Sequence, residues 1–326
     1  MSIVIESSCV DAFEHLMQSE ITPALVHDFL RKPSFNKMIS ACGRCVGIKD
    51  GDFATWETLM LHALNNLDCA LVNEGIYYKN IYNAFQAAGN DLPRLKQNLA
   101  TVKDLLETYD FVAIAHRYLP GIQREGSITA SLMFGLSNCF APPGDRMYLD
   151  VNFLAGMPTA LINGIVAHEY HHMLRENVLN QKAMKTRHRK TYGDLRMLEC
   201  EAIADMCNGF EKSLWFYEEL GFISRKEMLS RLENYKNIFA EFETLFCEQP
   251  KKLHGFLFSH NLNLHLIGHC MATTIQENLG IERLAGCVGD CIQFLTAFQE
   301  ASKASSQPYG YVFSETFMKK LAKIAN

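Results

Sequence analysis

Residues Ala160–Arg175, ALINGIVAHEYHHMLR, are the stretch around which the rest of the chain can be organised. The run is long and apolar enough to predict a helix. It contains an H-E-x-x-H pattern from His168 to His172, and residues four apart share one face of a helix, so both imidazoles can point at one metal ion. Leu161 and Ile165 follow the same rhythm, which predicts that the two histidines lie on the buried side of the helix.

Glu169 lies between the two histidines and is the candidate for proton transfer. One position round the helix from His168, its carboxylate can hold a metal-bound water molecule without binding the metal itself. His171 points about 100° away from His172 on a helix, so we do not expect it to be a ligand.

A second apolar and acidic stretch, Leu195 to Cys207 (LRMLECEAIADMC), also has helical spacing. A catalytic zinc site typically has three protein ligands and one open position, and Glu201 would complete a His₂Glu set. Asp205, one turn later, could accept the second ring N–H of a zinc-binding histidine. Two alternatives stay open: the two acids form a solvated stripe, or Glu199, about 160° from Glu201 on the helix, is the ligand instead.

The sequence HEYHHMLRE followed by ECEAIAD resembles the gluzincin metallopeptidases, and more narrowly bacterial families of zinc-dependent peptidases whose function is not established. The resemblance covers roughly Tyr118 to Ala301. It implies a Zn²⁺ cofactor bound by the two histidines and a glutamate on a second helix, with an aspartate one turn later. The interval from His172 to Glu201 (201 − 172 = 29 residues) is longer than in thermolysin-like enzymes and leaves room for a basic insertion around Lys185 to Lys190.

A third stretch, Asn261 to Gly280, places His265 and His269 four apart on a predicted helix. They could form a second metal pair, although no nearby acidic residue completes a site. The resemblance implies that a tyrosine or histidine in this part of the chain donates to the oxyanion. Gly268-His269 matches that position, with His265 as the second choice. Two buried histidines bonded to backbone carbonyls are the alternative.

The remaining pattern predicts a mainly α (α+β) fold, a zincin-like domain with a small sheet beside the H-E-x-x-H helix. Residues 1–118 are predicted to be a helical N-terminal region, and residues 119–326 the peptidase domain. Ser127 to Phe134 and Met147 to Phe153 are predicted strands. The second of these (MYLDVNF) could offer a free edge to an extended substrate, or could be a core strand.

Composition limits the class of protein and its partners. Of the 326 residues 48% are apolar and 21% charged, which is typical of a globular protein, and the net charge of −5 argues against nucleic acid or an anionic membrane as a partner. The N-terminus lacks a basic region of the kind found in signal peptides. Eleven cysteines, an odd number, favour reduced thiols in the cytoplasm, and Cys42 and Cys45 are expected to be ordinary thiols.

These observations predict a zinc-dependent metallopeptidase that hydrolyses peptides or proteins, with Glu169 as general base and His269 or His265 as oxyanion donor. Two other functions remain possible from the sequence. The same zinc chemistry could cleave another amide or an ester, or the protein could be an inactive, zinc-binding descendant of a peptidase that acts through its N-terminal region. The sequence makes no prediction about the oligomeric state.

Overall fold

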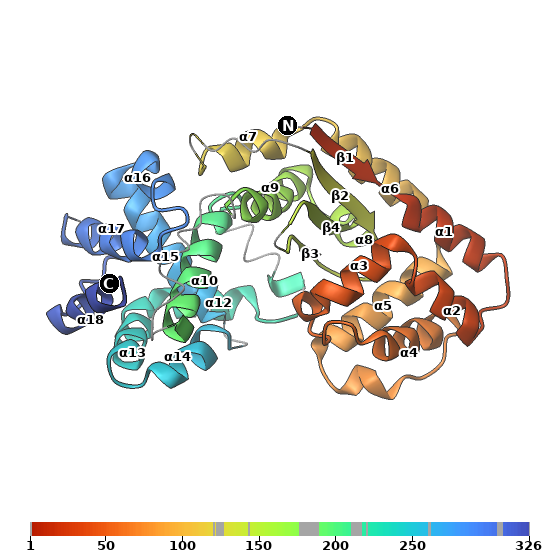
Figure 1. The fold of residues 1–326 in the computed structure, drawn as a ribbon, viewed down its shortest axis with the longest axis horizontal. Coiled ribbons are helices and arrows are strands. Elements are labelled where there is room, and N and C mark those ends of the chain that lie inside the picture. The colour runs from red at the N-terminus through yellow and green to blue at the C-terminus, as the bar shows by residue number, and fades with distance from the viewer. Residues whose placement is uncertain are drawn as a thin grey trace. The chain divides into compact units, whose positions relative to one another are not determined.

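The structure is a computed structural model, and it describes residues 2–119, 121, 127–142, 144–175, 189–209, 217–219, 221–259, 262–304 and 309–325. Helices dominate it (Figure 1). The chain divides into two compact units: the first comprises Met1–Phe111 and Glu125–Glu169, and the second comprises Val112–Arg124 and Tyr170–Asn326. The division passes through two continuous helices, α7 (Asp110–His116) and α9 (Thr159–Arg175).

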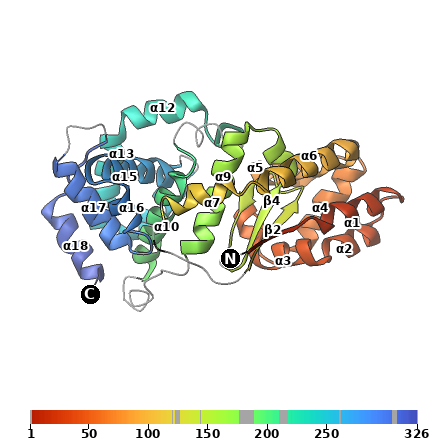
Figure 2. The same ribbon diagram turned by 90° about the horizontal axis from the view of Figure 1, so that it is seen from above.

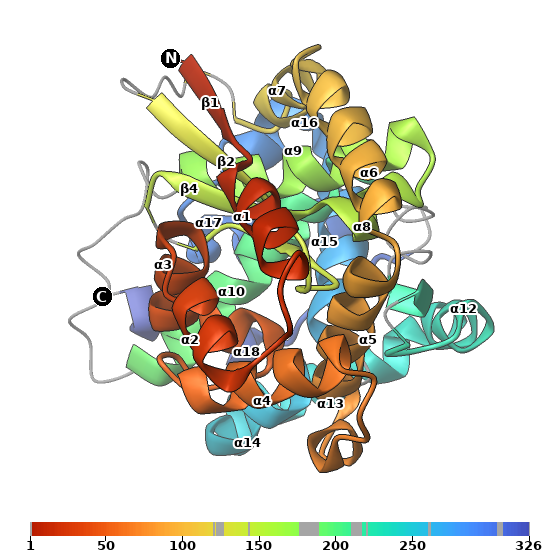
Figure 3. The same ribbon diagram turned by 90° about the vertical axis from the view of Figure 1, so that its right-hand side faces the viewer.

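The first unit contains a small sheet. Its strands, in the order β1-β2-β4-β3, are β1 (Ser2–Glu6), β2 (Ser127–Met133), β4 (Arg146–Asp150) and β3 (Cys139–Phe140). β2 is parallel to both β1 and β4, whereas β3 is antiparallel to β4. β2 and β4 lie side by side in both Figures 2 and 3.

β1 corrects the expectation that residues 1–118 are helical throughout. Its five residues pair in register with the segment from Ser127 to Ser131, more than a hundred positions along the chain. A strand this short has too few alternating positions for its own pattern to show it, and its pairing partner lies far away in the sequence. The two predicted strands around Ser127 and Met147 are present as β2 and β4.

β4 is shorter than predicted because Asp150 begins a helix. The Asp150 carboxylate accepts hydrogen bonds from the backbone N–H groups of Asn152 and Phe153, at 2.9 and 3.1 Å, and so caps α8 (Val151–Ala155). β4 is an inner strand of the sheet, since β2 lies on one side of it and β3 pairs with Tyr148 and Leu149 on the other. The expected free edge is therefore absent at these two residues, and substrate binding along MYLDVNF stays a prediction.

Helices surround this sheet in the first unit. Thr22 and Asp91 cap two of them, as their positions before Pro23 and Leu92-Pro93 predict, by accepting from the N–H groups of Leu25 and Arg94. The helices are α1 (Ser8–Met17), α2 (Pro23–Leu30), α3 (Pro33–Cys42), α4 (Phe53–Leu64), α5 (Ile76–Asn90), α6 (Leu92–Leu106), and the 3₁₀ turns η1 (Gly43–Val46) and η2 (Ala70–Asn73).

A buried aromatic cluster holds the helices of the first unit to the end of β2. Phe134 is its centre, with ring centroids 4.4 to 6.2 Å from the rings of Phe13, Phe29, Phe35 and Phe85. All five side chains are buried. Burial of one such ring contributes roughly 1.5–3 kcal/mol, so this cluster stabilises the packing of α1, α2, α3 and α5 on β2.

The second unit is helical in its described residues. α15 packs against α10, α16 and α17, and these neighbours can be followed in Figures 1 and 2. Phe313 and Phe317 stack at 4.0 Å between ring centroids in its core. The helices are α10 (Arg189–Asp205), α12 (Arg225–Glu233), α13 (Tyr235–Glu248), α14 (Pro250–Leu257), α15 (Asn263–Leu279), α16 (Ile281–Ala285), α17 (Cys291–Ala304) and α18 (Glu315–Ala325).

The fold class is thus confirmed as mainly helical with one small sheet, while the domain boundary after residue 118 stays a prediction. Residues 176–188, which hold most of the basic insertion, lie outside the described part of the chain, as does Asn261. None of the described helices combines the length and the apolar character needed to cross a membrane.

Candidate metal centre

α9 presents two histidines on a helix that is otherwise buried. From Leu161 to Arg175 every residue is buried except His168 and His172, which are partly exposed. The sequence predicts that these histidines lie on the buried side, and they are only partly exposed: the His172 side chain is 14% exposed. Since they share one face of the helix, solvent or a ligand can reach both imidazoles.

His168, His172 and Glu201 form a cluster that could hold a metal ion. One ligand atom from each lies within 4.8 Å of the others, and among the residues that the structure describes no other group of three such side chains does so. His172 Nε2 is 3.4 Å from Glu201 Oε2. Two ligands each about 2.1 Å from a tetrahedral zinc ion are roughly 3.4 Å apart, so this pair already has a ligating separation. α9 is continuous, so its own backbone fixes His168 relative to His172.

Glu199, the alternative to Glu201 as third ligand, is bonded to other residues of the second unit. Its fully buried carboxylate accepts hydrogen bonds from the Arg175 guanidinium, and the backbone N–H of Gly289 donates to it at 3.1 Å. Glu199 and Glu201 point in different directions from α10, as two positions on a helix require. The structure therefore brings Glu201, and not Glu199, to the histidines.

The electrostatics around His172 favour a cation. Burial lowers its pKa, but the neighbouring Cys200 and Glu201 outweigh burial and raise the pKa of His172 well above its usual value. A site that attracts a proton in this way also attracts a metal ion, which replaces the proton on the ring nitrogen. Two imidazoles and one carboxylate are also a donor set typical of catalytic zinc. The residues present therefore fit a zinc ion.

Asp205 and His265 form a pair beside this cluster. His265 Nδ1 lies 2.8 Å from Asp205 Oδ2. The close approach of α15 to α10 makes this possible: a Cβ atom on Gly268 would lie only 2.9 Å from the Cβ of Ala202, so glycine is required there. Asp205 thus has a partner on α15, while the expected bond from Asp205 to a zinc-binding histidine stays a prediction.

His269 lies in a different setting from His265. Burial lowers the pKa of His269 to about 4, so its imidazole is neutral at pH 7. Its Nδ1 lies 3.4 Å from Thr273 Oγ1, and its ring meets that of Tyr309 edge-on. The two histidines predicted as oxyanion donors are therefore not equivalent: His265 lies against a carboxylate, and His269 is a partly exposed ring with a lowered pKa.

Glu169 is buried, with 7% of its surface exposed, and its negative charge raises the pKa of two thiols in the first unit. Burial and then the Glu169 carboxylate raise the pKa of Cys139, on β3, well above its usual value. Burial, Cys42 and Glu169 raise that of Cys45 to about 12. These thiols stay protonated at pH 7, as expected for the ordinary thiols of the Cys42–Cys45 motif.

The predicted metal-binding and catalytic residues lie in a part of the chain that matches a known protein family. Residues 54–307 match the family described as "Putative zinc dependent peptidase (DUF5700)". The chain belongs to this family. No curated protein and no solved structure gave a match. The family match includes every predicted metal-binding and catalytic residue, from His168 to His269, and begins after β1 and the first three helices.

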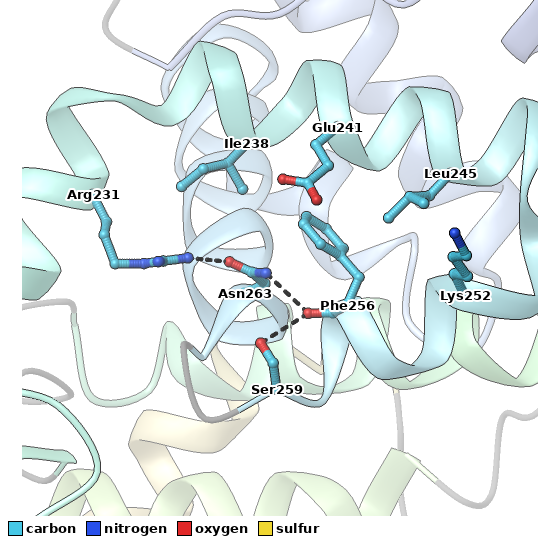
Figure 4. A pocket seen from close by; sticks show the side chains of 8 residues that line it. All are labelled: Arg231, Ile238, Glu241, Leu245, Lys252, Phe256, Ser259 and Asn263. Carbon is cyan, nitrogen blue, oxygen red and sulfur yellow. Dashed lines mark hydrogen bonds between the residues drawn. The ribbon is translucent and has the colours of Figure 1, made fainter.

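A separate hollow lies in the second unit of this family member (Figure 4). Its volume is about 390 Å³, and Asn263 organises its floor by accepting from Arg231 and donating to the Phe256 carbonyl at 2.9 Å. None of the predicted site residues lines it, so it is distinct from the His–His–Glu cluster. The lining residues are Arg231, Ile238, Glu241, Leu245, Lys252, Phe256, Ser259 and Asn263.

Proposed function

We propose that this protein is a zinc-dependent peptidase whose metal ligands are His168, His172 and Glu201. The observation that carries the proposal is the cluster of three ligand atoms within 4.8 Å, with Glu169 next to His168 on the same helix. Membership of a family described as zinc-dependent peptidases supports the same assignment. A purely structural site would need no carboxylate at position 169, and zinc sites of that kind are usually closed by a fourth protein ligand.

Zinc, when bound, supplies Lewis acidity, which polarises a carbonyl group and lowers the pKa of water. Glu169 then acts as general base and afterwards as general acid. Its carboxylate accepts a proton from the attacking water and delivers that proton to the nitrogen of the leaving amine. Glu169 is buried, with 7% of its surface exposed, so few water molecules other than the attacking one can compete for its carboxylate.

His265 is the better supported of the two oxyanion donors. Its Nδ1 lies 2.8 Å from Asp205 Oδ2, which orients the ring and leaves Nε2 to face developing negative charge. Asp205 lies one turn after Glu201 on α10, so this donor is anchored to the same helix as the third ligand. His269 is the weaker candidate because the neighbour of its Nδ1, at 3.4 Å, is the Thr273 hydroxyl and not a carboxylate.

The substrate is proposed to be a peptide or protein. Nucleic acid is a poor partner for a chain with a net charge of −5. The eleven cysteines are all free thiols, which supports a reducing compartment such as the cytoplasm. Hydrolysis of another amide or of an ester would use the same groups, so substrate class is decided by assay.

Replacement of Glu169 by glutamine tests the proposal. The variant keeps the size of the side chain and every metal ligand, so it should bind one zinc ion per chain and lose turnover of a peptide mixture by about a hundredfold or more. Zinc content is measured by elemental analysis, and cleavage by mass spectrometry. Peptide hydrolysis at the parental rate by Glu169→Gln would refute the catalytic assignment.

A further inference from the structure

A thiol lies against His172, the second histidine of the H-E-x-x-H motif. Cys200 Sγ is 3.1 Å from His172 Nδ1, within hydrogen-bonding distance for sulfur. Cys200 is buried, with 8% of its surface exposed, and it directly precedes Glu201 on α10. Both residues of this contact belong to the second unit. This contact could not be predicted from the sequence, because a cysteine next to a glutamate on a helix carries no specific signal.

The two ring nitrogens of His172 face two consecutive residues of α10. Nε2 faces Glu201 Oε2 at 3.4 Å, and Nδ1 faces Cys200 Sγ. Consecutive residues on a helix point about 100° apart, so their side chains can reach the two edges of one imidazole. α10 therefore supplies both a neighbouring ligand and a contact on the far side of the ring.

This geometry fixes the direction of the hydrogen bond once a metal is bound. A metal ion on Nε2 uses the lone pair of that nitrogen, so the single ring proton of neutral His172 must be on Nδ1. Nδ1–H then donates, and Cys200 Sγ lies within reach and can accept. The usual partners of zinc-binding histidines are carboxylates, backbone carbonyls and water, and a thiol is a different solution.

We propose that Cys200 is a positioning residue that accepts the Nδ1 proton of His172 and holds its imidazole in the metal-binding orientation and tautomer. The inference rests on the proposed function, because it needs a metal at His172. Cys200 would act on His172 in the way predicted for Asp205, one oxygen of which lies 2.8 Å from His265 Nδ1. Sulfur is a weak acceptor. Loss of Cys200 is therefore expected to weaken metal binding by a factor at the lower end of the range of about 10 to 100 that is typical of residues bonded to metal ligands.

The experiment compares zinc affinity in three variants of the full chain by competition with a chromogenic chelator. Cys200→Ala removes the acceptor and is expected to weaken zinc binding about tenfold. Cys200→Ser keeps an acceptor and is expected to restore affinity to within about threefold of the parent. Cys270→Ala removes another fully buried thiol of the second unit, on α15, and should leave affinity unchanged.

A second measurement separates hydrogen bonding from packing. Cobalt substitution shifts the Nδ1–H signals of metal-bound histidines away from other protons, and exchange of the His172 signal with solvent should be about tenfold faster in Cys200→Ala than in the parent. Parental affinity in Cys200→Ala, or equal losses in the alanine and serine variants, would overturn the inference alone. A parent that binds no zinc would overturn the proposed function, and the inference with it.

Discussion

α10 carries two aspartate–histidine pairs that have the same chemistry and different surroundings. Asp205 Oδ2 lies 2.8 Å from His265 Nδ1, and Asp194 Oδ1 lies 2.8 Å from His254 Nδ1. Both aspartate side chains are 6% exposed, but the His254 side chain is 52% exposed and that of His265 only 20%. The residue types and the distance cannot distinguish the two pairs.

Their positions along the helix do distinguish them. Asp205 follows Glu201 by one helical turn, whereas Asp194 precedes Glu201 by about two turns. His265 comes from α15, which touches α10 at Gly268 and Ala202, next to the proposed third ligand. His254 comes from α14 and is half open to water, where an ion pair contributes roughly 0–1 kcal/mol. An aspartate–histidine pair thus gains a catalytic assignment from its neighbours and from its burial.

The largest effect on activity is expected from removing Glu201, the proposed third ligand from which the positions of the two aspartate–histidine pairs were counted. Glu201→Ala should lower peptide turnover on the order of a thousandfold or more and abolish stoichiometric zinc binding, because the site keeps only two protein ligands. Zinc content and cleavage rate are measured on the same preparation.

Glu199→Gln is the matched control, two positions away on the same helix. It leaves Arg175 buried without its ionic partner, so it should destabilise the fold by about 3–5 kcal/mol. Each folded molecule should still bind zinc. If Glu199→Gln loses zinc and Glu201→Ala retains it, the choice of third ligand is wrong.

The second prediction compares the loss of His265 with the loss of His254. His265→Ala should reduce kcat by about a hundredfold with little change in zinc content, because it removes a donor to the oxyanion. His254→Ala should leave kcat within about twofold of the parent. Steady-state kinetics on one peptide substrate checks both variants. Equal losses in the two would mean that position relative to Glu201 does not decide the role of a pair.

The smallest effect concerns pH and the metal-free protein. The pKa of His172 is raised in the folded state, so protonated His172 stabilises the fold below the unfolded pKa of about 6.5, and this stabilisation is lost as pH rises through the higher folded value. The free energy of unfolding should therefore fall, by at most about 1.4 kcal/mol per pH unit, in that range. Urea titrations at several pH values should show this slope in the parent and not in His172→Gln. An unchanged slope in the variant would contradict the prediction.

The sequence was sufficient for the features that depend on local spacing. The H-E-x-x-H helix, the caps at Thr22 and Asp91, and Glu201 on a second helix all follow from patterns of three to five residues. The features it missed depend on contacts between segments that are distant in the sequence. β1 pairs with residues more than a hundred positions away, and β3 pairs with part of the edge of β4 that was expected to be free.

Within the candidate site the same limit holds. The sequence favoured Glu201 as third ligand and left Glu199 open, whereas the structure shows Arg175, from another helix, bound to Glu199. The preference for His269 over His265 came from a resemblance at Gly268-His269, whereas Asp205 lies against His265. Helical spacing determines which residues share a face, but the partner on the next helix is set by packing.

X-ray absorption at the zinc edge of the full chain would show which atoms bind the metal. We expect one zinc ion per chain with four nitrogen or oxygen neighbours at about 2.0–2.2 Å, two of them with the outer-shell pattern of imidazole, and no sulfur neighbour. A neighbour at about 2.3 Å, the zinc–sulfur distance, would make Cys200 or another thiol a ligand and would contradict the assignment of His168, His172 and Glu201 with an open fourth position.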